Sequence, residues 1–174
     1  LENVNIIGNN YVGGLIGQTG GHVLNTYVKG KVSGNNYVGG LIGSGYGNIN
    51  NSYSQAAVSG NSNVGGFIGE ANNDNVKYVY STGLVSGSGS DIGGLVGNGK
   101  VFYSFWDKEN SNQAENNSGS GKSSSEMKKI STYFNEGWDF IAEKNNGSED
   151  YWDIDITTKI NEGYPFLSWE NSES

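Results

Sequence analysis

The chain has 174 residues, 34% of them hydrophobic, and its net charge of −8 is carried without a single arginine. Binding of nucleic acid or of an anionic membrane normally needs a basic patch, often with arginine for bidentate phosphate contacts, so the composition disfavours both, and we expect no nucleic-acid partner. The absence of cysteine rules out disulfides and thiolate metal sites. No apolar run approaches the ~18 residues of a membrane-spanning helix, so we expect no direct membrane insertion.

Residues 1–99 repeat one short phrase. Double glycines begin at positions 13, 39, 65 and 93, so the steps are 26, 26 and 28 residues. An apolar pair and another glycine follow each time, as in Gly13-Gly14-Leu15-Ile16-Gly17. Self-similarity at such a period is typical of stacked units that cannot bury an apolar face alone.

Each repeat holds three short apolar or β-branched stretches separated by Gly, Asn and Ser. One contains the double glycine, and a second ends on tyrosine at positions 27, 53 and 80. The third precedes the next repeat, at residues 6–8, 32–34, 58–60 and 85–87. Strands this short are stable when each pairs with its equivalent one coil away, at ~4.8 Å. The pattern therefore predicts an all-β fold, a right-handed parallel β-helix (β-solenoid) of about four coils of ~26 residues.

The direction of the side chains after the double glycine stays open. Alternation along a strand places Val12 and Ile16 inside. It turns the leucine position outward, unless the double glycine bends the strand and resets the phase. The residues concerned are Leu15, Leu41, Phe67 and Leu95. If they point outward, they form an exposed apolar stripe suited to docking.

Polar residues are expected at the corners of the coil. Glycine and asparagine tolerate the positive φ that a corner needs. Asn9, Asn35 and Asn61 occupy equivalent positions. We expect them to stack in register and to exchange side-chain amide hydrogen bonds, as ladders of identical residues do.

After residue 99 the repeat stops, and all four tryptophans follow, at positions 106, 138, 152 and 169. Residues 110–125 are predicted to be a polar loop. Ser123-Ser124-Ser125-Glu126 fits a capping box, and Met127, Ile130 and Phe134 follow at helical spacing, which predicts one short helix near 124–134. Because a solenoid otherwise ends in unpaired strands, we expect residues 100–174 to be a small mixed α/β cap over the last coil. The first coil has no comparable cap, so we expect a larger surface protein to continue N-terminal to Leu1.

The repeated phrase Gly-Gly-Leu-Ile-Gly with its Asn-rich entry resembles the GLUG repeat, found in large bacterial and archaeal surface proteins, adhesins and the non-catalytic parts of some immunoglobulin A peptidases. The resemblance covers residues 1–99 with four copies. It extends downstream, because residues 105–107, 121–127, 137–140 and 160–167 look like the segment that commonly ends such arrays. The resemblance implies a β-solenoid on the cell surface and carries no catalytic residues.

Candidate ligand-binding residues lie in the C-terminal segment. Tyr151, Trp152 and Trp169 are aromatic residues that could form a sugar-stacking platform on the outer face of the cap; the alternative is that they form the small core of the cap.

A group of acids in the same segment is the candidate metal site. Residues 152–156 alternate like a strand, which places Asp153 and Asp155 on one face with Asp150 nearby. Clustered carboxylates can hold calcium, which takes six to eight oxygens. Asp107 and Glu109 are weaker candidates for calcium ligands. The alternative is a solvated acidic face, so a structural calcium ion is the one cofactor left open.

Catalysis is not expected. The acids of the coils, Glu70, Asp74 and Asp91, lie in different repeats at different register positions, so no carboxylate pair recurs. His22 is the single histidine and lies in a polar turn, with nothing to indicate a triad. Residues 43–47 have a G-x-G-x-G spacing without the strand-to-helix context of a phosphate loop.

These observations predict a non-catalytic extracellular or cell-surface adhesion module, the stalk or tip of a larger surface protein. Binding of a glycan or of a surface or matrix protein would use a side of the solenoid or the aromatic residues of the cap, as a surface and not as a deep pocket. The main alternative is a polysaccharide-processing β-helix, a lyase or a hydrolase. A third is an ice-binding solenoid, for which the flat threonine ladder is missing.

Overall fold

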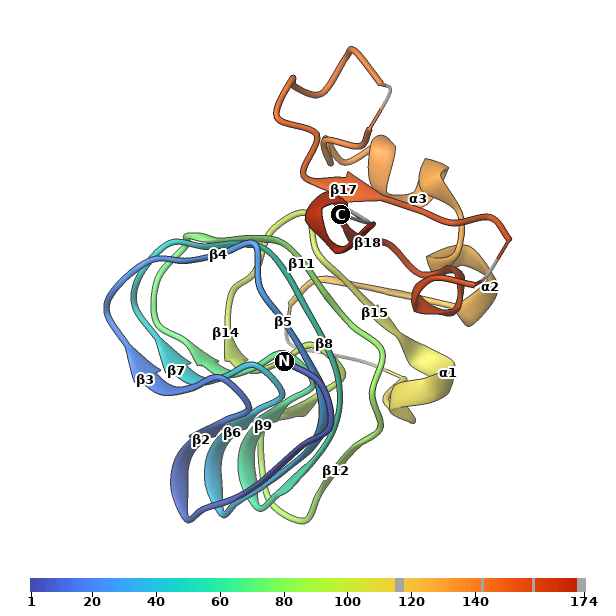
Figure 1. Ribbon diagram of the computed structural model, residues 1–174. Helices are drawn as coiled ribbons and strands as arrows, with labels where there is room; N and C mark the ends of the chain where they lie inside the picture. Colours follow the sequence, from blue (N-terminus) through green and yellow to red (C-terminus); the bar gives the residue numbers. More distant parts are fainter. Residues whose placement is uncertain (115–117, 142, 158, 172–174) are drawn as a thin grey trace.

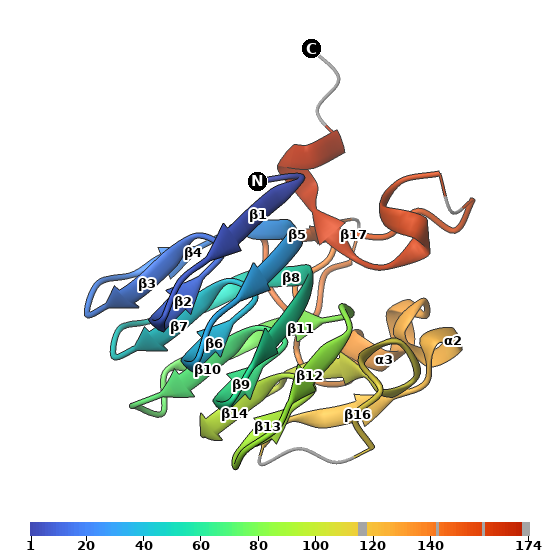
Figure 2. The ribbon, with the colours of Figure 1, turned by 90° about the horizontal axis from the view of Figure 1, so that it is seen from below.

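The repeats form a parallel β-solenoid in the computed structural model, which describes residues 1–114, 118–141, 143–157 and 159–171. Seen along the solenoid axis, successive coils overlie one another, and the C-terminal part of the chain lies beside them (Figure 1). Seen from a perpendicular direction, the coils stack from β1 toward β13 and β16 (Figure 2). The predicted all-β solenoid is therefore confirmed.

Three parallel sheets within the described residues form the walls of the solenoid. The first wall follows the order β1 (Val4–Ile7), β5 (Tyr27–Ser33), β8 (Ile49–Gly60), β11 (Val76–Ser81), β15 (Phe105–Asp107) and β16 (Ser120–Lys122), with β4 (Val23–Leu24) and β12 (Val85–Gly87) also paired to β8. The second contains β2 (Asn10–Gly13), β6 (Asn36–Gly39), β9 (Ser62–Gly65) and β13 (Ile92–Gly93). The third contains β3 (Ile16–Thr19), β7 (Ile42–Gly45), β10 (Ile68–Ala71) and β14 (Val96–Gly99).

The register of the walls follows the sequence period. Val12 pairs with Val38, Val38 with Val64, and Val64 with Ile92, always in parallel. Each repeat therefore adds one rung to every wall, as the double-glycine spacing predicts.

Both residues of the apolar pair after the double glycine face the interior. Leu41, Phe67 and Leu95 are fully buried, and so are Ile42 and Ile68 in the next position. The alternation of inward and outward side chains does not continue across the double glycine, because β6 ends at Gly39 and β7 begins at Ile42, with a bend between them. The predicted alternative of an exposed stripe is therefore wrong for these coils, whereas Leu15 in the first coil is 37% exposed.

The double glycine is required for space. A Cβ atom built on Gly39 would overlap the carbonyl oxygen of Ile42, and one on Gly40 would overlap the carbonyl oxygen of Gly66 in the next coil. Neither glycine has a positive φ. Instead, the left-handed conformation is adopted by non-glycine residues in two columns along the stack, Tyr11, Tyr37, Asn63 and Asp91, and Asn25, Asn51, Tyr78 and Tyr103. Asparagine thus adopts positive φ as expected, with tyrosine and aspartate at equivalent positions, and Gly30 and Gly99 are among the glycines that also have positive φ.

The expected asparagine ladder forms through the backbone. The amides of Asn35 and Asn61 donate to the carbonyl oxygens of Asn9 and Asn35, at 2.6 and 2.7 Å. The side-chain amide bond occurs one residue later, where Asn36 Nδ2 donates to Asn10 Oδ1 at 3.0 Å.

The described residues that cover the end of the solenoid are 101–107 together with Gln113, which donates to the Val85 carbonyl oxygen, and Gly119, which packs near Leu95. Because β15 pairs with β11 and β16 pairs with β15, the first wall continues past residue 99. Val101 and Trp106 belong to the inner core, and a Cβ on Gly94 would collide with the Trp106 ring. The predicted boundary at residue 99 therefore cuts through a continuous wall.

The rest of the C-terminal part lies along the outer face of the first wall (Figures 1 and 2). We call the described residues 123–141, 143–157 and 159–171 the flank segment. This segment holds α2 (Ser124–Met127), α3 (Ile130–Phe134), β17 (Trp152–Asp153), η1 (Asn161–Gly163), β18 (Phe166–Leu167) and η2 (Ser168–Asn171), while α1 (Lys108–Ser111) precedes β16. Its aromatic side chains cover the outward rings of Tyr53, Tyr80 and Phe105, forming a second core.

The single helix predicted near 124–134 is two short helices. The capping box is present, with the Ser123 side chain accepting from the Glu126 amide and the Glu126 side chain accepting from the Ser123 amide. The helix ends at Met127 because Lys129 is extended, at φ −114° and ψ 125°. Because of this break, the Tyr133 side chain packs in the second core and Ile130 is 43% exposed. The helical spacing predicts instead that Met127, Ile130 and Phe134 share one apolar face.

Candidate ligand-binding surface

A column of stacked tyrosine rings organises the junction between the solenoid and the flank segment. Tyr27, Tyr53 and Tyr80 occupy equivalent positions in β5, β8 and β11, and their ring centroids are 5.0 and 4.9 Å apart. Their side chains face outward because Val28 and Ser54, the next residues along the strands, are fully buried inside the coil. The column therefore holds the flank segment against the wall.

Trp152 is part of this internal packing. Its side chain is fully buried, with its ring 4.5 Å from Trp138 and 5.9 Å from Tyr80. Its Nε1 donates to Asn51 Oδ1 at 3.4 Å. A sugar ring cannot reach a face of Trp152, so the prediction of this residue as a stacking platform is wrong.

Trp169 lies at the opposite end of the column and is 50% exposed. Its ring stacks on Tyr27 at 5.8 Å. The neighbouring Glu170 accepts a hydrogen bond from Tyr53 Oη at 2.8 Å. Burial, followed by the charge of Glu170, raises the pKa of Tyr27 to about 12. Trp169 is accessible to a ligand, and its role remains a prediction.

Tyr151 lines a small cavity between the first wall and the flank segment. The cavity measures about 130 Å³, and its lining is Asn51, Tyr78, Gly137, Asp139, Asn146 and Tyr151. Asn51 and Tyr78 come from equivalent positions in β8 and β11, both with positive φ, of 48° and 53°. Both residues belong to the second of the two columns in the left-handed conformation, the one that runs from Asn25 to Tyr103.

Asp139 is the one charged residue in the described lining of this cavity, and it is 8% exposed. Its Oδ2 accepts from the Glu149 amide at 3.0 Å. Its Oδ1 is buried and receives no donor from the described part of the chain. Asn146 is held beside it, because its Nδ2 donates to the carbonyl oxygens of Phe134 and Trp138 at 2.8 and 3.2 Å.

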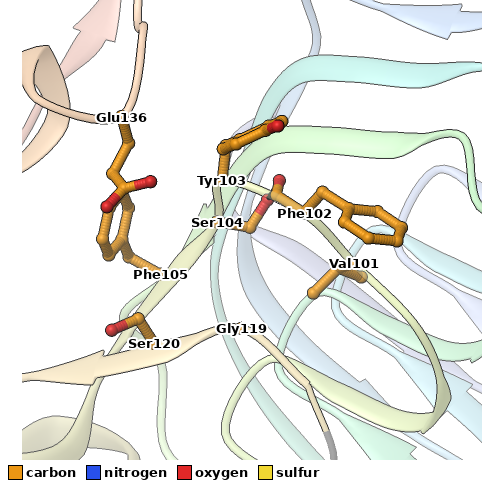
Figure 3. Close-up of a pocket in the computed structure, with 8 residues that line it drawn as sticks. All are labelled: Val101, Phe102, Tyr103, Ser104, Phe105, Gly119, Ser120 and Glu136. Atoms are coloured by element: carbon orange, nitrogen blue, oxygen red, sulfur yellow. Dashed lines mark hydrogen bonds between the residues drawn. The ribbon is translucent and has the colours of Figure 1, made fainter.

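A second hollow continues along the same column of the wall. The Tyr78 ring stacks on Tyr103 at 5.5 Å, and burial raises the pKa of Tyr78. Tyr103 lines a hollow of about 300 Å³ together with Phe102, Ser104 and Glu136. Figure 3 shows Glu136 facing this strand across the hollow, above Phe105 and Ser120. The Tyr78–Tyr103 stack therefore separates two neighbouring hollows on one side of the solenoid.

The predicted calcium ligands do not share a strand. β17 ends at Asp153, and Asp155 folds back on its own loop, accepting from Thr157 Oγ1 and from the amides of Lys159 and Ile160. These hydrogen bonds, that of the Thr157 side chain first, lower the pKa of Asp155 to about 2. Asp150 adopts a positive φ of 52°. Within the described residues, no three acids or histidines come together as a metal site, and calcium binding remains a prediction.

The weaker acidic candidates are structural. Asp107 is fully buried and caps α1, accepting from the amides of Glu109 and Asn110 at 2.9 Å. Its Oδ2 also accepts from Tyr164 Oη at 2.7 Å. Glu109 accepts from the Ser124 amide at 3.0 Å. Asp107 thus ties the end of the first wall to the flank segment.

The remaining sequence candidates lie apart from this junction. His22 is exposed in the turn before β4. Gly43 and Gly45 lie within strand β7, not at a corner, so the G-x-G-x-G spacing forms no phosphate loop.

Sequence reasoning missed four of the cavity residues, Asn51, Tyr78, Asp139 and Asn146. Asn51 and Tyr78 lie in the recurring stretch that ends on tyrosine, and their equivalence was visible from the period. Asp139 lies in Gly137-Trp138-Asp139-Phe140, which was noted only as part of the ending segment.

Comparison with known proteins agrees with the repeat. Over 85 residues the chain is 34% identical to a protein described as a Gly-rich membrane protein of Evansella cellulosilytica, covering 44% of this chain and 10% of the relative. The chain thus spans about a tenth of the length of that relative. No solved structure matches the chain. In the described part of the chain, no helix has the length and apolarity needed to span a bilayer. The family model of the GLUG motif matches residues 8–33, so the first repeat of the solenoid carries a GLUG motif.

Proposed function

We propose that this chain is a non-catalytic binding module of a larger surface protein, which attaches to glycans through the side of the solenoid that carries the flank segment. The observation that supports it most is the cavity at Tyr151, where aromatic, amide and carboxylate side chains meet at the surface. Sugar sites combine aromatic surface with a few placed polar groups. The surface location rests on the GLUG match and on the name of the relative.

Several acids after residue 100 already serve the fold, which supports a non-catalytic role. Asp107 caps a helix, Glu126 completes a capping box, and Glu170 accepts from Tyr53. Hydrolases and lyases need acids held free to transfer protons. The hollows here are small and shallow, so we expect weak binding at each site, strengthened when many copies are displayed together.

The test compares single and multiple copies. The purified chain, free in solution and coupled at high density to beads, is applied to arrays of glycans and of matrix proteins. We expect the beads to be retained on glycans far more strongly than the free chain, while chromatography finds each glycan unchanged. Retention on neither class of ligand would refute the binding role. Release of reducing ends or of unsaturated sugars, lost on changing one carboxylate, would instead establish the polysaccharide-processing alternative.

A further inference from the structure

The cavity at Tyr151 has a hydrogen-bonding pattern that selects its ligand. Asp139 Oδ1 is an acceptor without a donor among the described residues. Asn51 uses its Oδ1 on Trp152 and, within the same residues, leaves its Nδ2 unused as a donor. Asn146 uses its Nδ2 on two backbone carbonyls, which leaves its Oδ1 as an acceptor. The residues that line the cavity thus supply acceptors and a donor.

An unpartnered buried carboxylate oxygen is costly unless something supplies its hydrogen bond. The other buried oxygens without a donor in the described part of the chain belong to Asn25, Asn50 and Asn161, and none of them lines this cavity. Asp139 is therefore the one orphan oxygen that a ligand in this cavity can satisfy.

From this pattern we propose that the cavity binds one edge of an uncharged sugar ring, with a hydroxyl donating to Asp139 Oδ1 and accepting from Asn51 Nδ2. This assignment rests on the proposed glycan-binding function and names its ligand class. A hydroxyl both donates and accepts, whereas an ammonium group only donates and would face the Asn51 amide with nothing to offer it. The volume of about 130 Å³ has room for more than one water and is on the scale of one ring edge.

Acidic sugars are excluded by charge. No described lining residue of the cavity is cationic, and Asp139, which is 8% exposed, is acidic. A uronate carboxylate placed there would meet a like charge. The net charge of −8 adds a weaker repulsion at longer range.

The experiment follows amide shifts of the ¹⁵N-labelled chain during titration with methyl glycosides. Neutral probes are the glycosides of glucose, galactose, mannose, xylose, fucose and N-acetylglucosamine, and the acidic probes are those of glucuronate and galacturonate. We expect at least one neutral glycoside to saturate shifts at Asn51, Gly137 and Tyr151 in the millimolar range, and both uronates to leave them unchanged. Neutral glycosides without effect, or uronates as effective as neutral ones, would overturn the assignment.

Two variants test the residues, with a matched control. In Asp139→Asn, the amide oxygen can still accept from the Glu149 amide, while an NH₂ replaces the acceptor in the cavity. We expect the affinity for the neutral glycoside to fall about tenfold or more. Tyr151→Leu should weaken binding as well. Asp150→Asn changes the charge equally next to Tyr151, outside the cavity lining, and should bind like the unchanged chain.

Two outcomes separate the assignment from the general function. If Asp139→Asn binds as tightly as the control while both keep dispersed amide spectra, the ring edge does not sit on Asp139. If calcium or tetramethylammonium shifts the same amides and neutral glycosides do not, the cavity is a cation site. In either case, bead retention on glycans that persists shows binding elsewhere, for example at Trp169, so only the assignment fails.

Discussion

Replacing Trp152 by Ala should release the flank segment without unfolding the coils. Trp152 is fully buried between Tyr53, Tyr80 and Trp138, and it belongs to the second core. The inner core of the coils is a separate cluster. Loss of the indole therefore removes packing from the flank segment and leaves the inside of the solenoid intact.

The expected cost can be estimated from the buried area. A tryptophan buries roughly 200 Å², which at ~25 cal/mol per Å² gives an upper value of ~5 kcal/mol, within the ~3–5 kcal/mol seen for such changes in cores. Trp169 is 50% exposed. Its replacement by Ala should therefore cost at most about half as much, ~2.5 kcal/mol, and both values are upper bounds because the unfolded chain is partly compact.

Urea unfolding followed by far-UV circular dichroism and native-state hydrogen exchange measure the effect. For Trp152→Ala we expect a lower midpoint and a smaller m value, because a detached flank segment leaves less surface to expose. Protection from exchange should be lost at two amides of the flank segment, that of Ile141, which donates to the carbonyl oxygen of residue 152, and that of residue 152, which donates to the carbonyl oxygen of Asp139. Protection should be retained at the amide of Val64, which donates to the carbonyl oxygen of Asp91 in the next coil. The reasoning is refuted if Trp169→Ala destabilises as much as Trp152→Ala, or if protection at Val64 falls together with that at Ile141.

Three further outcomes follow from the packing and from one carboxyl group. Phe67→Ala should lower the free energy of unfolding by ~3–5 kcal/mol, because the Phe67 side chain is fully buried. Leu15 occupies the equivalent position in the first coil and is 37% exposed, so Leu15→Ala should lower it clearly less. Equal urea midpoints for the two variants would contradict this. Gly39→Ala should lower the melting temperature strongly, since its Cβ would meet backbone atoms of the next coil, and unchanged melting would show that the coils can separate freely. Burial raises the pKa of Glu170 in the folded state, so the fold favours the protonated carboxyl group. The stability that this group adds is fully present below its unfolded-state pKa and is lost as the pH rises through its folded-state pKa. Glu170→Gln should therefore be more stable than the unchanged chain at pH 7 and lose that advantage near pH 4; a constant difference across this range would exclude the carboxyl group as the cause.

Much of the site lay beyond prediction from sequence, for a physical reason. Tyr151 was predicted to belong to a sugar-stacking platform; it lines a cavity, and its binding role remains a prediction. Trp152, its neighbour, was assigned the same role and is buried. Which of two adjacent aromatic residues faces inward depends on β17, a strand of only two residues, whose pairing with β18 is set by packing and not by any periodic pattern.

The sequence by itself determined the coil and its register. In a parallel solenoid every residue pairs with its equivalent one period away, so spacings of 26, 26 and 28 residues translate directly into the pairings of Val12, Val38, Val64 and Ile92. Only the tertiary structure decided that Leu41 and Ile42 both face inward, because the bend at Gly39 and Gly40 depends on how closely the next coil approaches. It also decided that the aromatic residues of the flank segment cover the outer face of the first wall and not the end of the solenoid, and that Asn51, Asp139 and Tyr151 line one cavity. Contacts between residues about a hundred positions apart arise from the fit of side chains, and no local pattern encodes them.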